Sequence, residues 1–260
     1  MEDVEGLSFR REGSVATVIL DRPDKLNALT WKMVQGLTDF VEECGRDDDL
    51  RAIVITGAGR AFCAGADLRS TIPRLMDDPD HNAYPAPPTI MRGQTVTKPL
   101  IAAVNGLALG GGLEIVLACD LRIAADSARF GAPEVTLGLI PGWGGTQRLP
   151  RQLPWAVAAR INLPGEPLTA QEALQVGLVN AVVPAANLVA EARRWGEALC
   201  RCGPLALRAA KEAMLRGREM PLEEGLELEQ RLFNSLAYSK DVREGLTAFH
   251  ERRPPQFKGE

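Results

Sequence analysis

The chain contains few of the residues that build metal, redox or disulfide centres. Its 260 residues include two histidines and five cysteines. The histidines, at positions 81 and 250, are too far apart for an HExxH metal site. The cysteines are odd in number and form no CxxC pair, which favours reduced thiols in a cytosolic compartment. Cys200 and Cys202 fall in a helical pattern that points their thiols apart, so we expect no metal there.

Long apolar runs and an excess of positive charge are also absent. No stretch of 18 apolar residues occurs, and the acidic start "MEDVEGLSFRREGS" lacks the apolar segment of a signal peptide. The formal net charge is −4, which argues against a surface dedicated to nucleic acid. We therefore expect a cytoplasmic protein with neither a membrane nor a nucleic acid as partner.

Short β-branched runs alternate with helical patterns through most of the chain. Apolar residues recur at helical spacing after Thr30, a plausible N-cap. Taken alone, this alternation predicts a doubly wound α/β fold. The predicted strands are Val15–Leu20, Arg51–Thr56, Pro99–Gly106 and Leu121–Asp126.

The pattern changes near residue 195, after which three helical segments follow without a strand between them. We therefore expect two parts, a core over residues 1–195 and a helical region over residues 196–260. The polar, proline-rich stretch 70–88 is typical of an exposed loop.

One glycine-containing motif suggests a nucleotide site, and its details exclude that interpretation. "TGAGR" (56–60) follows a predicted strand, as in the phosphate loop of short-chain dehydrogenases. The third glycine of that loop is missing, and no Tyr-x-x-x-Lys follows. A nicotinamide cofactor is therefore not expected.

Two carboxylates stand in apolar, glycine-rich surroundings. Glu114 follows the triplet Gly110–Gly112 in the apolar run "LEIVLAC", and a glycine-rich helix start offers backbone N–H groups to an anion. Close packing of the helix would explain the triplet equally well. Glu134 precedes a second glycine-rich stretch that ends at Gly145, and taken alone it fits a solvated loop acid better than a functional one. Buried carboxylates are costly unless they are paired or functional, and two with different environments can divide acid and base roles.

Three segments together resemble the crotonase superfamily, and most closely its enoyl-CoA hydratase branch: "AFCAGADL", "NGLALGGGLEIVLACD" and "FGAPEVTLGLIPGWGGTQRL". The resemblance extends over nearly the whole chain. It replaces the doubly wound expectation with a spiral of ββα turns and a helical C-terminal region that assembles trimers or dimers of trimers. It implies an acyl-CoA thioester as substrate and no metal or redox cofactor.

The resemblance also implies roles for individual residues. The N–H groups of Ala64 and Gly111 would form an oxyanion hole for the thioester oxygen. Glu114 would deprotonate water, Glu134 would deliver a proton to Cα, and Gly142 would help to position the water. Candidate contacts to coenzyme A or the acyl group are Lys25, Ala28, Ala64, Gly65, Ala66, Asp67, Leu68, Gly111 and Trp143.

Other activities remain open at this stage. Trp143, a position often occupied by a small residue in this family, would reshape the acyl pocket. An enoyl-CoA isomerase, or a hydratase specialised for branched or aromatic acyl groups, is the nearest alternative. A non-catalytic relative that binds RNA is a third, disfavoured by the acidic net charge.

Overall fold

The computed structural model describes residues 4–76 and 88–260. Its strands form two separate sheets. Within these ranges the large sheet has the order β1-β2-β3-β5-β7-β10, and only its β1–β2 pair is antiparallel. Its strands are β1 (Leu7–Glu12), β2 (Val15–Leu20), β3 (Ala52–Gly57), β5 (Leu100–Val104), β7 (Leu121–Ala125) and β10 (Ala181–Val183). The small sheet has the order β4-β6-β8-β9, formed by β4 (Ala61–Cys63), β6 (Leu107–Leu109), β8 (Arg129–Gly131) and β9 (Leu168–Thr169).

Successive turns of chain place one strand in each sheet and then form a helix. Strands β3 and β4 precede α2 (Thr71–Met76), and β5 and β6 precede α3 (Gly111–Ala118). Strands β7 and β8 precede the 3-10 helix η2 (Pro133–Leu137) and α4 (Gly145–Gln152). This repeated ββα path confirms the predicted spiral. The doubly wound expectation was wrong because the small sheet consists of strands of two or three residues, too short to produce a periodic signal.

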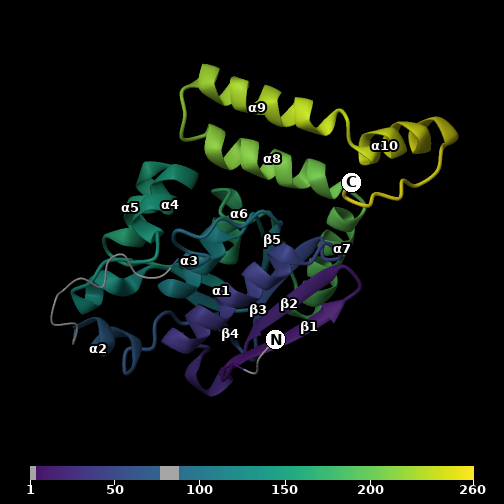
Figure 1. Cartoon of the computed structure of the whole chain (residues 1–260). Helices are drawn as coiled ribbons and strands as arrows, with labels where there is room; N and C mark the ends of the chain where they lie inside the picture. The colour runs from purple at the N-terminus through teal and green to yellow at the C-terminus, as the bar shows by residue number, and fades with distance from the viewer. Residues whose placement is uncertain (1–3, 77–87) are drawn as a thin grey trace.

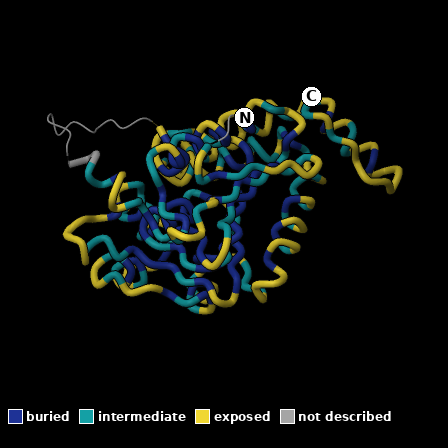
Figure 2. The backbone as a smooth tube through the Cα atoms, turned by 90° about the horizontal axis from the view of Figure 1, so that it is seen from below, coloured by how far each residue is buried: buried dark blue, intermediate teal, exposed yellow. Residues whose placement is uncertain are grey.

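Helix α3 is the central element of the core. All of its residues except Ala118 are buried, and it contacts β5 of the large sheet together with β4 and β6 of the small one. Helix α1 (Trp31–Arg46) covers another part of the core with a single apolar face, and its N-cap Thr30 accepts a hydrogen bond from the Met33 N–H. Figure 2 shows the buried backbone gathered in this central region. The N-terminus of α3 therefore lies inside the molecule.

Further short helices connect these elements. Helices α5 (Trp155–Asn162) and α6 (Ala170–Gln175) each bury residues in the core, and the short 3-10 helices η1 (Pro23–Lys25) and η3 (Ala185–Asn187) bury none. Helix α7 (Leu188–Cys200) packs on β2, β3, β5 and β7. The predicted boundary at residue 195 thus falls inside α7, a helix that packs against the large sheet.

A helical extension begins after α7. Helices α8 (Pro204–Gly217) and α9 (Leu222–Leu236) pair side by side, and α10 (Lys240–Glu251) continues past them (Figure 1). This arrangement confirms the three predicted C-terminal helices. Large apolar side chains stay exposed on them, among them Leu222, Phe233 and Phe249.

The predicted loop 70–88 is only partly correct. Thr71–Met76 form α2, and the Thr71 hydroxyl anchors its start by donating to the Leu29 carbonyl at 2.9 Å. Residues 77–87 lie outside the described part of the chain. Within the described part, no helix is long and apolar enough to cross a membrane.

Candidate active site

Glu114 lies in the first turn of α3 and is 2% exposed. Its Oε1 accepts hydrogen bonds from the Trp143 N–H at 2.7 Å and from the Gly145 N–H at 2.8 Å. Burial raises its pKa from 4.5 to about 7; the Gly145 and Trp143 N–H groups oppose this rise, and the charge of Glu134 adds to it. A carboxyl with this pKa can exchange a proton near neutral pH.

Glu134 approaches the same helix end from η2. Pro133 starts that short helix, and Gly138, at φ 73°, closes it. A Cβ built on Gly110 would lie 3.0 Å from Oε1 of Glu134, so the carboxyl rests directly against the glycine that caps α3. Burial raises its pKa as well. Its buried Oε2 accepts no hydrogen bond from the described part of the chain. The fold thus brings together the two carboxylates that the sequence singled out.

The glycine triplet serves close packing, one of the two purposes considered from the sequence. A Cβ on Gly112 would lie 2.3 Å from the Cys63 carbonyl oxygen, so this glycine is required for packing. A Cβ on Gly111 would lie 2.6 Å from the Trp143 ring, which covers it. Gly65, at φ 104°, brings its own chain segment against this turn, because a Cβ there would lie 3.5 Å from the Gly111 nitrogen. The backbone at 64–66 and the N-terminus of α3 therefore face each other.

The structure places the predicted oxyanion donor Ala64 in another role. Its N–H donates to the Leu26 carbonyl at 2.9 Å and is therefore engaged inside the protein. The N–H of Ala66, on the other side of Gly65, donates to no carbonyl in the described ranges 4–76 and 88–260. Of the two, the Ala66 N–H is thus better placed than the Ala64 N–H to serve, with the Gly111 N–H, as a hydrogen-bond donor to a ligand oxygen.

Sequence reasoning missed a residue that holds the loop around Trp143. The half-buried Arg148 of α4 donates from Nη1 to the Met91 carbonyl at 2.7 Å and to the Trp143 carbonyl at 3.1 Å. Trp143 in turn holds Glu114 through its own N–H. The sequence offered one weak signal, a basic residue three positions after the glycine pair Gly144–Gly145. Arg148 therefore positions the loop whose N–H groups bind the catalytic candidate.

The predicted coenzyme A segments meet through a second residue that the sequence reasoning missed. Arg22 donates to the Ala28 carbonyl at 2.7 Å and pairs with Asp67 at 3.0 Å. It ties together the two segments that carry the coenzyme A candidates. Lys25 and Leu68 are exposed beside these contacts.

The loop of the Ala28 segment depends on Asn27. Asn27 is fully buried at φ 57°, a conformation that asparagine tolerates, and its amide donates to the carbonyls of Ala58, Ala61 and Phe62. Gly142, the water-positioning candidate, is exposed, and its carbonyl accepts from Arg92 at 3.4 Å.

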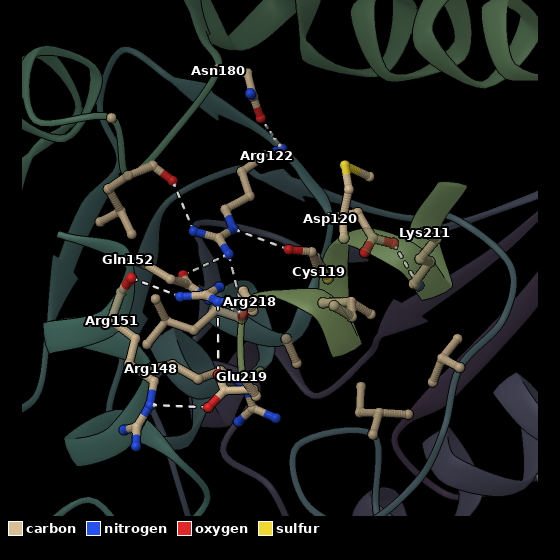
Figure 3. A pocket seen from close by; sticks show the side chains of 18 of the residues that line it. Cys119, Asp120, Arg122, Arg148, Arg151, Gln152, Asn180, Lys211, Arg218 and Glu219 are labelled. Carbon is tan, nitrogen blue, oxygen red and sulfur yellow. Dashed lines mark hydrogen bonds and ion pairs between the residues drawn. The ribbon is translucent and has the colours of Figure 1, made fainter. Parts of the chain in front are cut away.

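A cavity of about 630 Å³ lies at the opposite end of α3. Figure 3 shows its arginines, which come from β7 (Arg122), from α4 (Arg148 and Arg151) and from the end of α8 (Arg218). Arg122 donates to the carbonyls of Leu117, Cys119 and Leu178, so its charge supports the fold around α3. The two carboxylates thus lie at one end of α3, and Arg122 supports the other end.

Comparisons with known proteins identify the family of this chain. The sequence pattern of the family described as "Enoyl-CoA hydratase/isomerase" matches residues 10–260. The chain is 42% identical to 2,3-dehydroadipyl-CoA hydratase of Escherichia coli (strain K12), over 97% of this chain and 98% of that protein. It is also 42% identical to (E)-benzylidenesuccinyl-CoA hydratase of Thauera aromatica, over 94% and 96% of the two chains.

A solved structure gives the same result. The crystal structure of an enoyl-CoA hydratase subunit from Geobacillus kaustophilus HTA426 superposes with a TM-score of 0.92 at 42% identity and covers all of both chains. Full-length agreement in sequence and fold establishes that this chain belongs to the enoyl-CoA hydratase/isomerase family.

Proposed function

We propose that this enzyme is a hydro-lyase that adds water reversibly across the 2,3 double bond of a 2-enoyl-CoA thioester to give the 3-hydroxyacyl-CoA. The observation that carries the proposal is the pair of buried Glu114 and half-buried Glu134, two carboxyls with raised pKa values beside the N-terminus of α3. Hydration needs one group to take a proton from water and another to give a proton to carbon, and this pair can supply both.

The thioester oxygen would accept hydrogen bonds from two backbone N–H groups. Gly111 supplies one at the positive end of α3, and Ala66 replaces Ala64 as the second because the Ala64 N–H is engaged. Negative charge develops on this oxygen as water attacks Cβ and the C=C electrons move into an enolate. One preorganised donor lowers the barrier of comparable reactions by about 3–4 kcal/mol.

The proton transfers divide between the carboxyls. Ionised Glu114 takes a proton from the attacking water, whose oxygen bonds to Cβ. Protonated Glu134 then gives its proton to Cα of the enolate, which completes the hydroxyacyl product. Its raised pKa keeps this proton available. We expect Gly142, next to the Trp143 N–H that holds Glu114, to help orient the water.

The chain's assembly is a further part of the proposal. The extension α8–α10 exposes large apolar side chains, including Leu222 at 72% and Phe249 at 79%, more than a monomer in water usually leaves uncovered. We propose that these helices join subunits into a trimer or a dimer of trimers.

A spectrophotometric assay tests the reaction. Loss of the conjugated thioester absorbance from an (E)-2-enoyl-CoA, with mass-spectrometric detection of a product heavier by one water, supports hydration. Conversion of a 3-enoyl-CoA to its 2-enoyl isomer, without addition of water to either, would instead make the enzyme an isomerase.

A further inference from the structure

A second cavity, of about 670 Å³, borders the loop that binds Glu114. Pro141, Gly142 and Gly144 of that loop line it, together with the segment 91–93 and the first turns of α4. The Trp143 and Gly145 N–H groups of the same loop hold Glu114 Oε1. The loop that lines this cavity thus also holds the carboxylate of Glu114 on α3.

The lining of this cavity combines apolar surface with positive charge. Met91, Pro141 and Ile140, which is 69% exposed, supply the apolar part. The charged side chains among the described lining residues are Arg92, Arg148 and Arg151, and none of the lining residues in the described ranges is Asp or Glu. Such a lining suits an apolar chain that ends in an anion.

The arginines differ in how far the protein itself uses their charge. Arg148 is committed to the carbonyls of Met91 and Trp143. Arg151 bonds to the carbonyl and side chain of Gln147, and its approach to Glu219 is long, 3.9 Å, with both side chains about half exposed. A pair of that kind contributes little. The positive charge of Arg151 therefore stays largely uncompensated by the protein and can attract a ligand carboxylate, which arginine can bind with two parallel hydrogen bonds.

We propose that this cavity receives a second carboxylate at the far end of the acyl group, so that the preferred substrates are 2-enoyl-CoA thioesters of dicarboxylic acids. The proposal rests on the proposed hydratase function. With the thioester at Gly111 and Cβ at Glu114, the remainder of the acyl chain follows the loop 140–145 toward the cavity. Arg151 then meets its carboxylate, and Arg92, which also donates to the Gly142 carbonyl, adds positive charge beside it.

The test compares two substrates of equal length, the six-carbon (E)-2-enedioyl-CoA and (E)-hex-2-enoyl-CoA. We expect kcat/KM to favour the dicarboxylic substrate by about tenfold or more, the scale of one charge-assisted contact. Arg151→Gln and Arg92→Gln should each reduce this ratio, by up to about tenfold, and Arg151→Lys by less. Arg193→Gln is the matched control, because Arg193 is an exposed arginine of α7 paired with Glu197. It should leave the ratio unchanged.

The outcomes separate this proposal from the hydratase function. Hydration of the neutral substrate at a rate equal to or above that of the dicarboxylic one overturns the carboxylate subsite and leaves the function intact. Hydration of neither substrate overturns the function. Inhibition by free coenzyme A gives a last comparison. If Arg151→Gln weakens this inhibition by as large a factor as it lowers kcat/KM for the dicarboxylic substrate, the arginines bind coenzyme A phosphates, and the proposal is wrong.

Discussion

Replacing Glu114 by Gln should make the folded protein more stable above neutral pH while it removes activity. The amide oxygen of Gln can accept the same two hydrogen bonds from the Trp143 and Gly145 N–H groups, so the shape of the site is kept. What disappears is the cost of holding a charge at a position that is 2% exposed.

The size of this gain follows from the raised pKa of Glu114. Its pKa rises from 4.5 to about 7 on folding, so the folded protein binds this proton more tightly than the unfolded chain does. The associated stability is fully present below pH 4.5 and is lost as the pH rises to about 7. The full loss is about 3 kcal/mol, and about 2.5 kcal/mol of it falls between pH 5 and pH 8. The Gln variant has no such loss.

Urea unfolding of both proteins at pH 5 and pH 8, at one protein concentration, measures this difference. We expect the free energy of unfolding of Glu114→Gln, relative to the unmodified protein, to increase by about 2–3 kcal/mol from the lower to the higher pH. An equal difference at the two pH values would refute the reasoning, because it would mean that Glu114 is not held at the cost of a buried charge.

Further predictions concern the loop, the pocket and the assembly. Arg148→Met should lower kcat by about tenfold and move the acid limb of the kcat/KM profile to higher pH, because the Arg148 charge lowers the pKa of Glu114. Arg148→Lys keeps the charge and should restore the position of the acid limb. An acid limb that stays in place in the Met variant would contradict the positioning role. Trp143→Ala should increase relative activity on bulkier acyl groups, measured as kcat/KM across a substrate series; an unchanged preference would place the ring outside the acyl pocket. Light scattering at micromolar concentration should give a trimeric or hexameric mass, and a monomeric mass would count against assembly through α8–α10.

The sequence predicted the parts of the fold that repeat over many residues. The long parallel strands, α1 with its Thr30 cap and the three C-terminal helices all carry strong periodic patterns, and each is confirmed. The small sheet was not predicted from periodicity, because β4, β6 and β8 have three residues each. It followed only from the family resemblance.

The site divides in a similar way. Glu114 and Glu134 were recognised as carboxylates in apolar surroundings, and the fold brings both to Gly110 and Gly111. The sequence could not show which backbone N–H groups are already bonded inside the protein and which remain available to a ligand. The donation from the Ala64 N–H to Leu26 depends on a contact between two distant segments, and local sequence carries no sign of it.

The supporting residues were missed for a related reason. Arg148 and Arg22 act through bonds to backbone carbonyls of other segments. A carbonyl is present at every residue, so no residue type in the sequence identifies it as the partner of an arginine. Residues that bind substrate through their own chemistry can be recognised from sequence more readily than residues that hold those in place.

The central claim is that Glu114 and Glu134 act as one unit on one water and one double bond. The measurement that tests it most directly is kcat for hydration of an (E)-2-enoyl-CoA by Glu114→Gln, Glu134→Gln and the double variant. We predict that each single change lowers kcat by about 100-fold or more and that the double variant is little slower than the slower single one. Losses that multiply in the double variant, or near-normal hydration by Glu114→Gln, would contradict the account.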